Sequence, residues 1–176
     1  MTDKEFINAL ANGKADVIQN LLDLLEKTDT LYCLIGGLAV NAYVDPVVSL
    51  DLDIVVALEN VTAVIGLANE QGSKVETFEH SINISSASSD LRIQLQTDPQ
   101  YQAFISRAGN RKVLGYTIRV AALDDVLQGK VWAYMDKTRR KSKRQKDLAD
   151  IMRILEAFPE LEEKLPQGVR DNLNKD

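Results

Sequence analysis

Two hydrophobic spacings divide the chain into short helices and strands. Apolar residues at roughly helical intervals predict helices at about 3–27, 38–44, 61–71, 99–107, 123–136 and 145–157. Apolar runs or alternating apolar and polar positions predict strands at about 31–35, 50–57, 74–78, 81–85 and 91–96. A hairpin is expected over 112–114 and 117–120, turned at Gly115-Tyr116. Beyond residue 120 the pattern is helical, with a short helix after Pro159 and a frayed tail past Gly168.

The length and composition suit one soluble domain. Of the 176 residues, 45% are hydrophobic and 27% are charged, which is ordinary for a globular fold. We expect a single domain over 1–176, with an α/β core over about 1–120 and C-terminal helices over about 121–165. No apolar run approaches the ~20 residues of a membrane span, and the N-terminus lacks the features of a signal peptide. Cys33 is the only cysteine, so the default compartment is a reducing cytoplasm.

The charge is unevenly distributed. The net charge is −5, yet residues 137–146 contain seven bases and no acid. Such a basic segment on an acidic body can attract phosphate groups. The alternative interpretation is a solvated, mobile loop without a specific partner.

A glycine pair and an aspartate pair are the most informative features. Gly36-Gly37 closes the apolar run 31–35, and Asp51 and Asp53 open the run 50–57. Two glycines at a strand end allow the backbone to approach a phosphate. Two aspartates at i and i+2 on a strand point to one face, where they can hold a divalent metal that neutralises the same phosphates. Together they indicate a nucleotide-handling site, although the glycines alone would suit an ordinary strand-to-helix turn.

Two sequence blocks resemble a known family. The first is Gly36 to Tyr43 followed by Ser49 to Ile54, and the second is Leu123 to Ala133 followed by Arg144 to Ile151. They resemble the minimal nucleotidyltransferase (polymerase-beta-like) superfamily, and most closely its AbiEii-like branch of toxins. The blocks cover about a third of the chain.

The resemblance implies a nucleotidyltransferase fold of α/β (α+β) class, in which helices flank a mixed central sheet. It implies a Mg²⁺- or Mn²⁺-dependent transfer of a nucleoside monophosphate from an NTP to an RNA (tRNA-like) or protein acceptor, with a cognate antitoxin as partner. The residues that it singles out are Asp51 and Asp53 as metal ligands and, with Lys130 and Asp147, as catalytic residues. For the nucleotide they are Gly36, Gly37, Ser49, Lys130, Lys146 and Asp150. The charge of the basic segment adds candidates for nucleic-acid binding, namely Arg139, Arg140, Lys141, Lys143 and Arg144.

The chain departs from the family pattern at two places. The third acid of the metal site corresponds to Gln94, which carries no negative charge and cannot act as a base. Many relatives have an arginine shortly before the aspartate pair, where this chain has Val47-Val48. A degenerate member that binds a nucleotide or nucleic acid without turnover is therefore the first alternative, and a scaffold that uses the fold for interaction alone is the second.

Each remaining candidate has a purely structural interpretation. Lys130 can extend from a buried helix face to solvent, and Asp147 and Asp150 can be surface acids that pair with neighbouring lysines. Cys33 and Trp132 are expected in the core, and His80 is given no role.

Overall fold

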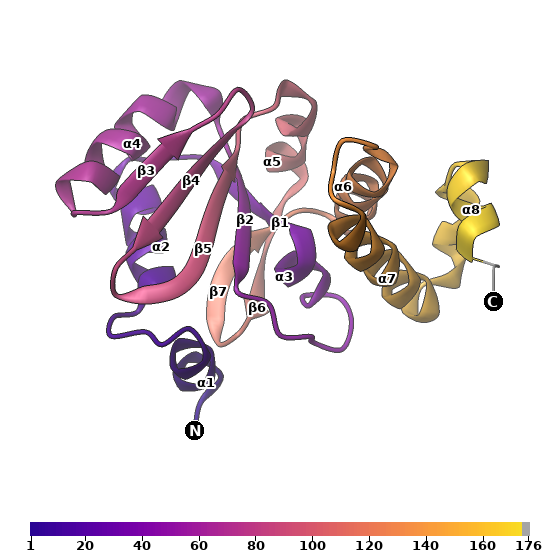
Figure 1. Cartoon of the computed structure of the whole chain (residues 1–176), viewed down its shortest axis with the longest axis horizontal. Helices are drawn as coiled ribbons and strands as arrows, with labels where there is room; N and C mark the ends of the chain where they lie inside the picture. The colour runs from indigo at the N-terminus through magenta and orange to yellow at the C-terminus, as the bar shows by residue number, and fades with distance from the viewer. Residues whose placement is uncertain (174–176) are drawn as a thin grey trace.

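The computed structural model describes residues 1–173 and has a seven-stranded mixed sheet at its centre. The spatial order is β3-β4-β5-β2-β1-β7-β6 (Figure 1). The strands are β1 (Tyr32–Ile35), β2 (Asp51–Val56), β3 (Lys74–Thr77), β4 (Ser81–Ser86), β5 (Ser89–Gln96), β6 (Gly109–Val113) and β7 (Tyr116–Val120). β2 pairs with β5 and β1 pairs with β7 in parallel, whereas the other pairs are antiparallel. The expected mixed sheet flanked by helices is confirmed.

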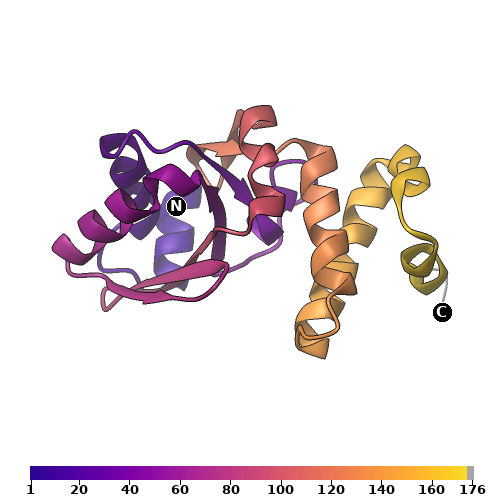
Figure 2. The same cartoon turned by 90° about the horizontal axis from the view of Figure 1, so that it is seen from above.

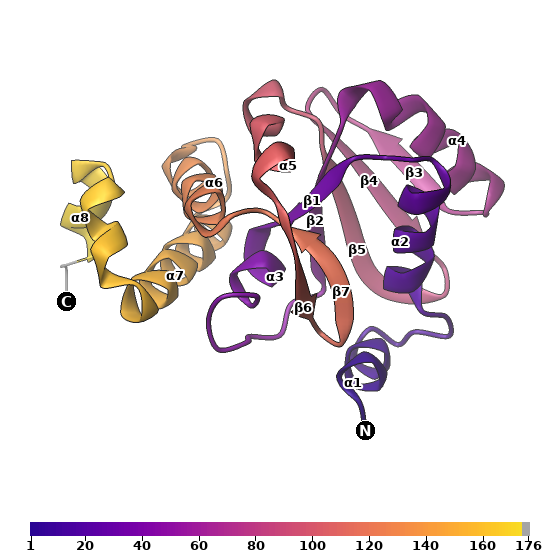
Figure 3. The ribbon, with the colours of Figure 1, turned by 180° about the vertical axis from the view of Figure 1, so that it is seen from behind.

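Helices cover the sheet unevenly. Figure 3 shows α2 (Val17–Lys27) and α4 (Val61–Glu70) over one face of β3, β4 and β5. On the strands, Ile84 and Ile93 face α2 and α4, so Gln94 projects from the opposite face. The remaining helices are α1 (Asp3–Leu10), α3 (Gly36–Val40), α5 (Ala103–Arg107), α6 (Leu123–Met135), α7 (Lys141–Ala157) and α8 (Gln167–Leu173).

The C-terminal helices form the second part of the molecule. Figure 2 shows α6, α7 and α8 side by side at one end of the sheet. α3 packs against α6 and α7 and so joins these helices to the strands. One buried hydrophobic cluster extends from the strands to residues of α6, α7 and α8. None of the helices within residues 1–173 combines the length and the apolar character that crossing a bilayer requires.

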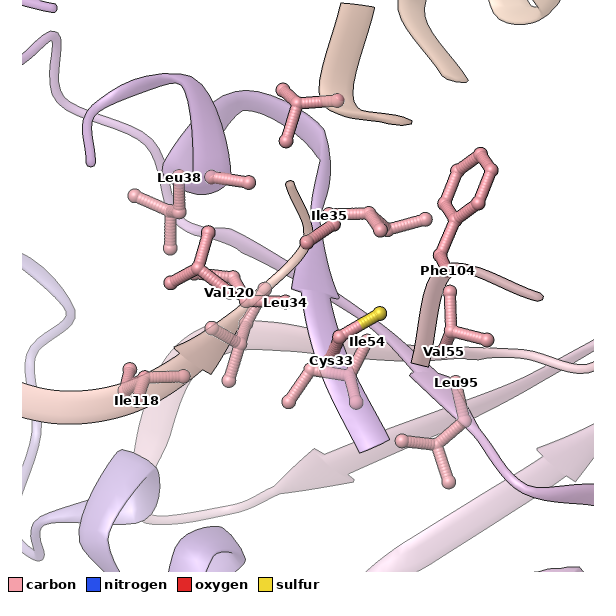
Figure 4. Packing of buried hydrophobic residues seen from close by; sticks show 14 of the residues in the cluster. Cys33, Leu34, Ile35, Leu38, Ile54, Val55, Leu95, Phe104, Ile118 and Val120 are labelled. Atoms are coloured by element: carbon pink, nitrogen blue, oxygen red, sulfur yellow. The ribbon is translucent and has the colours of Figure 1, made fainter. Parts of the chain in front are cut away.

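The core around the central strands is densely packed. Figure 4 shows Cys33 and Leu34 of β1 beside Ile54 of β2, with Leu95 and Phe104 close by. Cys33, Leu34 and Ile54 are fully buried, as expected for the apolar runs. Burial raises the pKa of the Cys33 thiol to about 12, with the Asp125 carboxylate adding to the effect. Trp132, expected in the core, is only partly buried and stacks on Phe104 with 5.7 Å between ring centroids.

Several predicted elements differ from the structure. The helix predicted over 3–27 is two helices, because Asn12 has a positive φ of 49° and the Asp16 side chain caps α2 by accepting from the Gln19 backbone N–H. The segment 99–107 is a 3₁₀ turn, η2 (Pro99–Tyr101), followed by α5. The β6–β7 turn lies at Leu114-Gly115, both with positive φ, and not at Gly115-Tyr116.

The C-terminal prediction also needs correction. α7 begins at Lys141, four residues before the predicted 145, so the second half of the basic segment is helical and not a mobile loop. A short 3₁₀ helix, η3 (Pro159–Lys164), follows Pro159 as expected. The prediction of a frayed tail past Gly168 is wrong as far as Leu173, because α8 occupies this stretch and buries Val169. Residues 174–176 lie outside the described part of the chain.

Candidate nucleotide site

The glycine pair is at the turn from β1 into α3. Gly36 has φ +73°, a left-handed conformation that favours glycine. A Cβ at Gly36 would lie 2.3 Å from Oδ2 of Asp53, which is closer than real Cβ contacts allow. The missing side chain of Gly36 therefore makes room for the Asp53 carboxylate, so the turn and the second aspartate lie side by side.

Asp51 and Asp53 line the same cavity of about 330 Å³. They are two residues apart on β2, so both project from one face of the sheet. Larger cavities exist elsewhere on the molecule, including one of about 550 Å³ beside α2. The gathering of bases around two strand carboxylates distinguishes this cavity from the larger one. Its lining residues are Gly37, Val47, Val48, Ser49, Asp51, Asp53, Lys130, Arg139, Lys143, Lys146, Asp147, Ala149, Asp150 and Arg153.

The two aspartates differ in their surroundings. The Asp51 carboxylate accepts from Arg92 Nε at 2.6 Å and from Lys143 Nζ at 3.0 Å. Burial opposes ionisation of Asp51, but Lys143 and Arg92 together hold its pKa below the usual range. The Asp53 carboxylate is surrounded by protein, although the residue keeps some exposure. Burial raises the pKa of Asp53 to about 6, and the positive charge of Lys130 opposes this rise.

Lys130 is buried between two carboxylates of α7. Its Nζ lies 2.7 Å from Asp150 Oδ2 and donates to Asp147 Oδ1 at 3.1 Å. Burial alone would lower the pKa of Lys130, but Asp150 and Asp147 raise it above its ordinary value. The interpretation of Lys130 as a side chain that extends to solvent is wrong, because Lys130 is only 8% exposed.

Two acids of α7, Asp147 and Asp150, are fully paired with bases. Asp147 Oδ2 accepts from Arg139 Nε at 2.8 Å, and Asp150 Oδ1 accepts from Arg153 Nη1 at 2.8 Å. With Lys130 on their other oxygens, all four carboxylate oxygens are paired. The interpretation of these residues as surface acids that pair with neighbouring lysines is also wrong, because Asp147 is only 2% exposed and both acids pair with Lys130.

This ionic network fixes the helices around the cavity. Arg153 also donates to Asn41 Oδ1 at 2.9 Å and to the Asp45 carbonyl, while Asn41 holds both backbone groups of Val47. The network therefore links α6 and α7 to the loop before β2. Ser49 Oγ accepts from the Asp51 backbone N–H at 3.2 Å and orients the start of that strand.

The basic segment divides into inward and outward residues. Arg139 and Lys143 point inward and bind Asp147 and Asp51, and Lys146 lines the cavity while remaining exposed. Three bases of the segment do not line this cavity. Arg140 and Lys141 are exposed, and Arg144 donates from Nε to the Tyr134 carbonyl at the end of α6.

Gln94 lies beside Asp53. In the parallel pairing of β2 with β5, Asp53 is opposite Gln94, and Asn83 of β4 is opposite Gln94 on its other side. Asp90, an acid near the start of β5, cannot take the place of Gln94, because it lies four residues earlier on the strand and accepts from Asn12 Nδ2 at 2.6 Å. The described residues contain no group of three or more acidic, cysteine or histidine side chains able to hold a metal.

The donor chemistry nevertheless suits one hard divalent cation. Asp51 and Asp53 carry carboxylate oxygens, the ligand type that Mg²⁺ prefers, and phosphate oxygens are the usual additional ligands. The space that Gly36 leaves for Asp53 is consistent with this use. A second cation would lack the third carboxylate of the family pattern.

Two site residues were missed by the sequence analysis. Arg92 was not identified, because its contact with Asp51 depends on the parallel register of β2 and β5. Arg153 could have been found from its spacing, since it follows Asp150 by three residues on a helix.

The fold is that of the nucleotidyltransferases. The chain is similar to ANT(2'')-Ia in complex with adenylyl-2''-tobramycin (TM-score 0.63, 14% identity), a match that covers 89% of this chain and 97% of that one. It is also similar to the lincosamide antibiotic adenylyltransferase LnuA with lincomycin bound (TM-score 0.56, 13% identity), over 81% of this chain and 98% of that one. An antigenic nucleotidyltransferase-like protein from Paracoccidioides brasiliensis is similar over 79% and 73% of the two chains (TM-score 0.53, 15% identity).

Sequence comparison adds no closer relationship. No protein-family model matches the chain, and no curated protein sequence is significantly similar to it. At identities of 13–15%, the structural similarities establish the fold alone. The AbiEii-like branch therefore stays a hypothesis.

Proposed function

We propose that the protein is a magnesium-dependent nucleotidyltransferase that moves a nucleoside monophosphate from an NTP to an acceptor hydroxyl. The observation that carries the proposal is the single cavity in which Asp51 and Asp53 face Lys130, Lys143 and Lys146 beside the Gly36 turn. Carboxylates for a metal and bases for phosphates are both required to bind a metal–triphosphate complex.

The residues have separate tasks in this proposal. The acceptor oxygen forms a bond to the α-phosphorus, the bond from that phosphorus to the pyrophosphate oxygen breaks, and the proton of the acceptor hydroxyl passes to solvent water. A bound Mg²⁺ would neutralise charge on the phosphates. Asp51 and Asp53 would hold it, while Lys146 and Lys143 are the bases available to the phosphates. Lys130 and Asp147 line the cavity but are positioning residues, because both are almost fully buried and each is paired within the protein.

For the acceptor we propose an RNA. Lys146 lines the cavity and is exposed, and Arg140 and Lys141 are exposed on the segment next to it, so the cavity is flanked by bases that suit a polyanion. A protein acceptor, and a hydroxylated small molecule of the kind that binds ANT(2'')-Ia and LnuA, are the competing acceptors. The AbiEii-like resemblance would add a role as a toxin with a cognate antitoxin.

The second candidate function is nucleotide or nucleic-acid binding without turnover. Gln94 favours it, because an amide beside Asp53 cannot accept the proton of the acceptor hydroxyl. Loss of a positioned base typically costs a factor of ~100 to 10,000 in rate.

A label-transfer assay tests both candidates. The protein is incubated with each α-³²P-labelled NTP, Mg²⁺ or Mn²⁺, and in separate reactions total tRNA, cell extract protein or hydroxylated antibiotics. The proposal expects label on RNA, loss of transfer in Asp51→Asn and Asp53→Asn, and faster transfer in Gln94→Glu. Transfer to protein or to an antibiotic would replace the RNA acceptor. Absence of transfer by both wild type and Gln94→Glu, with nucleotide still bound, would favour the binding function.

A further inference from the structure

Both oxygens of the Asp51 carboxylate are held by cations of the chain itself. Oδ1 is 2.6 Å from Arg92 Nε on β5, and Oδ2 is 3.0 Å from Lys143 Nζ on α7. A divalent cation would need these same oxygens. The protein therefore supplies its own counter-charge at the position where the proposed function requires a metal.

The two bases that pair with Asp51 can leave it for another partner. The side chains of Arg92, Lys143 and Asp51 are 69%, 30% and 29% exposed. All three side chains are reached by solvent, so Arg92 or Lys143 can exchange Asp51 for another partner without leaving a fully buried unpaired charge. The pairs of Asp147 differ in this respect, because that carboxylate and Lys130 are buried and cannot separate without leaving an unpaired charge.

A polyphosphate is the ligand best able to release these bases. Lys143 lines the cavity together with Lys130, Arg139, Lys146 and Arg153. Against these five bases stand four acids, Asp51, Asp53, Asp147 and Asp150. A cation alone would add positive charge next to Lys143 and Arg92, whereas a metal–triphosphate adds net negative charge and gives Lys143 a new partner.

We propose that Arg92 and Lys143 serve as an internal counter-cation for Asp51, so that a divalent metal enters the site together with a nucleoside triphosphate and not by itself. The proposal rests on the proposed function for its nucleotide. Arg92 and Lys143 are then specificity-determining residues, because they make metal binding conditional on the polyphosphate. Lys143 is on α7, so its exchange from carboxylate to phosphate also couples the C-terminal helices to site occupancy.

Mn²⁺ binding measured by electron paramagnetic resonance tests this without any turnover. The signal of free Mn²⁺ is titrated with wild type, Arg92→Gln, Lys143→Gln and the double variant, with and without a non-hydrolysable ATP analogue. The double variant should bind Mn²⁺ alone about tenfold or more tightly than wild type, since two nearby positive charges are removed. Adding Asp51→Asn to the double variant should abolish the gain. With the analogue present, the advantage over wild type should disappear.

A matched control separates local from general electrostatics. Lys74 and Lys164 each pair with an exposed carboxylate, Glu76 at 3.0 Å and Asp124 at 2.8 Å. The variant Lys74→Gln/Lys164→Gln therefore removes the same charge as the double variant, but from two ion pairs that do not involve Asp51. Lys74 is on β3 and Lys164 is on η3. It should leave Mn²⁺ binding unchanged. Thermal unfolding of every variant verifies that each is folded.

Two results would overturn the inference. One is wild type that binds Mn²⁺ alone as tightly as the double variant, and the other is an equal gain in the matched control. Failure of the proposed function gives a different result, namely that neither the ATP analogue nor an analogue of another NTP changes the free Mn²⁺ signal more with protein than without it. The comparison made with Mn²⁺ alone remains decisive for Arg92 and Lys143 in that case.

Discussion

Gly36 and Asp53 are coupled through the space that a single side chain would fill. The left-handed backbone of Gly36 and the 2.3 Å approach of a built Cβ to Asp53 Oδ2 are independent reasons for glycine at this position. The turn therefore determines where the second aspartate of β2 can place its carboxylate.

Gly36→Ala should lower the free energy of unfolding by at least about 1–2 kcal/mol, the cost of a left-handed residue with a Cβ. The contact with Asp53 adds to this cost, and nucleotide binding should weaken as well. Urea denaturation measures the first effect. Gly66→Ala is the matched control, because Gly66 lies inside α4 with no atom within 4 Å of a built Cβ. It should stabilise by up to about 1 kcal/mol. Equal effects of the two substitutions would contradict the assigned role of Gly36.

Asp53 should make the metal-free protein less stable at neutral pH than at mildly acidic pH. Its pKa is raised from 3.8 to about 6, so the folded state binds the proton more tightly than the unfolded chain. The ionised carboxylate then costs stability above pH 6, and the cost disappears as the pH falls towards 3.8. In EDTA at pH 8, Asp53→Asn should raise the free energy of unfolding by about 1–3 kcal/mol.

The difference between Asp53→Asn and wild type should shrink as the pH falls from 6 to 4. Denaturant titrations across this range measure it. Asp23→Asn, at an exposed position of α2, should change stability by about 0.5 kcal/mol or less. A difference for Asp53→Asn that does not vary with pH would argue against the assigned environment of Asp53.

At the scale of elements, buried ion pairs join α6 to α7. Lys130 of α6 lies between Asp147 and Asp150 of α7, and Arg139 and Arg153 occupy the remaining oxygens. Two helices that share a buried ionic network are constrained in both register and rotation. The cavity wall that they form is therefore rigid, whereas the contact of Lys143 with Asp51 is more exposed.

Asp147→Asn should destabilise the protein by about 3 kcal/mol, because it leaves Arg139 without its carboxylate and removes one of the two partners of buried Lys130. Asp124→Asn is the comparison, since it breaks the exposed pair with Lys164. That change should cost less than about 1 kcal/mol. Thermal and chemical unfolding of both variants decide the matter, and similar losses would mean that the network contributes no more than a surface pair.

The sequence predicted the elements better than their contacts. Apolar runs gave β1 and β2 to within one residue at each end, because buried strands leave an uninterrupted hydrophobic signal. The break between α1 and α2 was missed, since it depends on the left-handed Asn12 and the Asp16 cap within an otherwise helical spacing. The contact of Arg92 with Asp51 depends on which strands are neighbours, and local spacing does not encode that.

At the scale of the whole molecule, the candidate site is formed jointly by the α/β part and the C-terminal helices. Gly37, Asp51 and Asp53 come from the α/β part, and Lys130 and Lys146 come from α6 and α7. Residues from two distant stretches of the chain therefore meet in this shared cavity. The basic segment 137–146 was expected either to attract phosphate groups or to be a mobile loop, but in the structure Lys143 of α7 points inward and pairs with Asp51.

The central claim is that this shared cavity binds a nucleoside triphosphate through magnesium and the two aspartates. Isothermal titration calorimetry with non-hydrolysable analogues of the four NTPs, in Mg²⁺ and in EDTA, tests it most directly. Wild type should bind at least one analogue more tightly in Mg²⁺ than in EDTA. Asp51→Asn and Asp53→Asn should lose that difference, and Asp23→Asn should retain it. Absence of binding at millimolar concentration in Mg²⁺, or magnesium-dependent binding that both site variants retain, would contradict the claim.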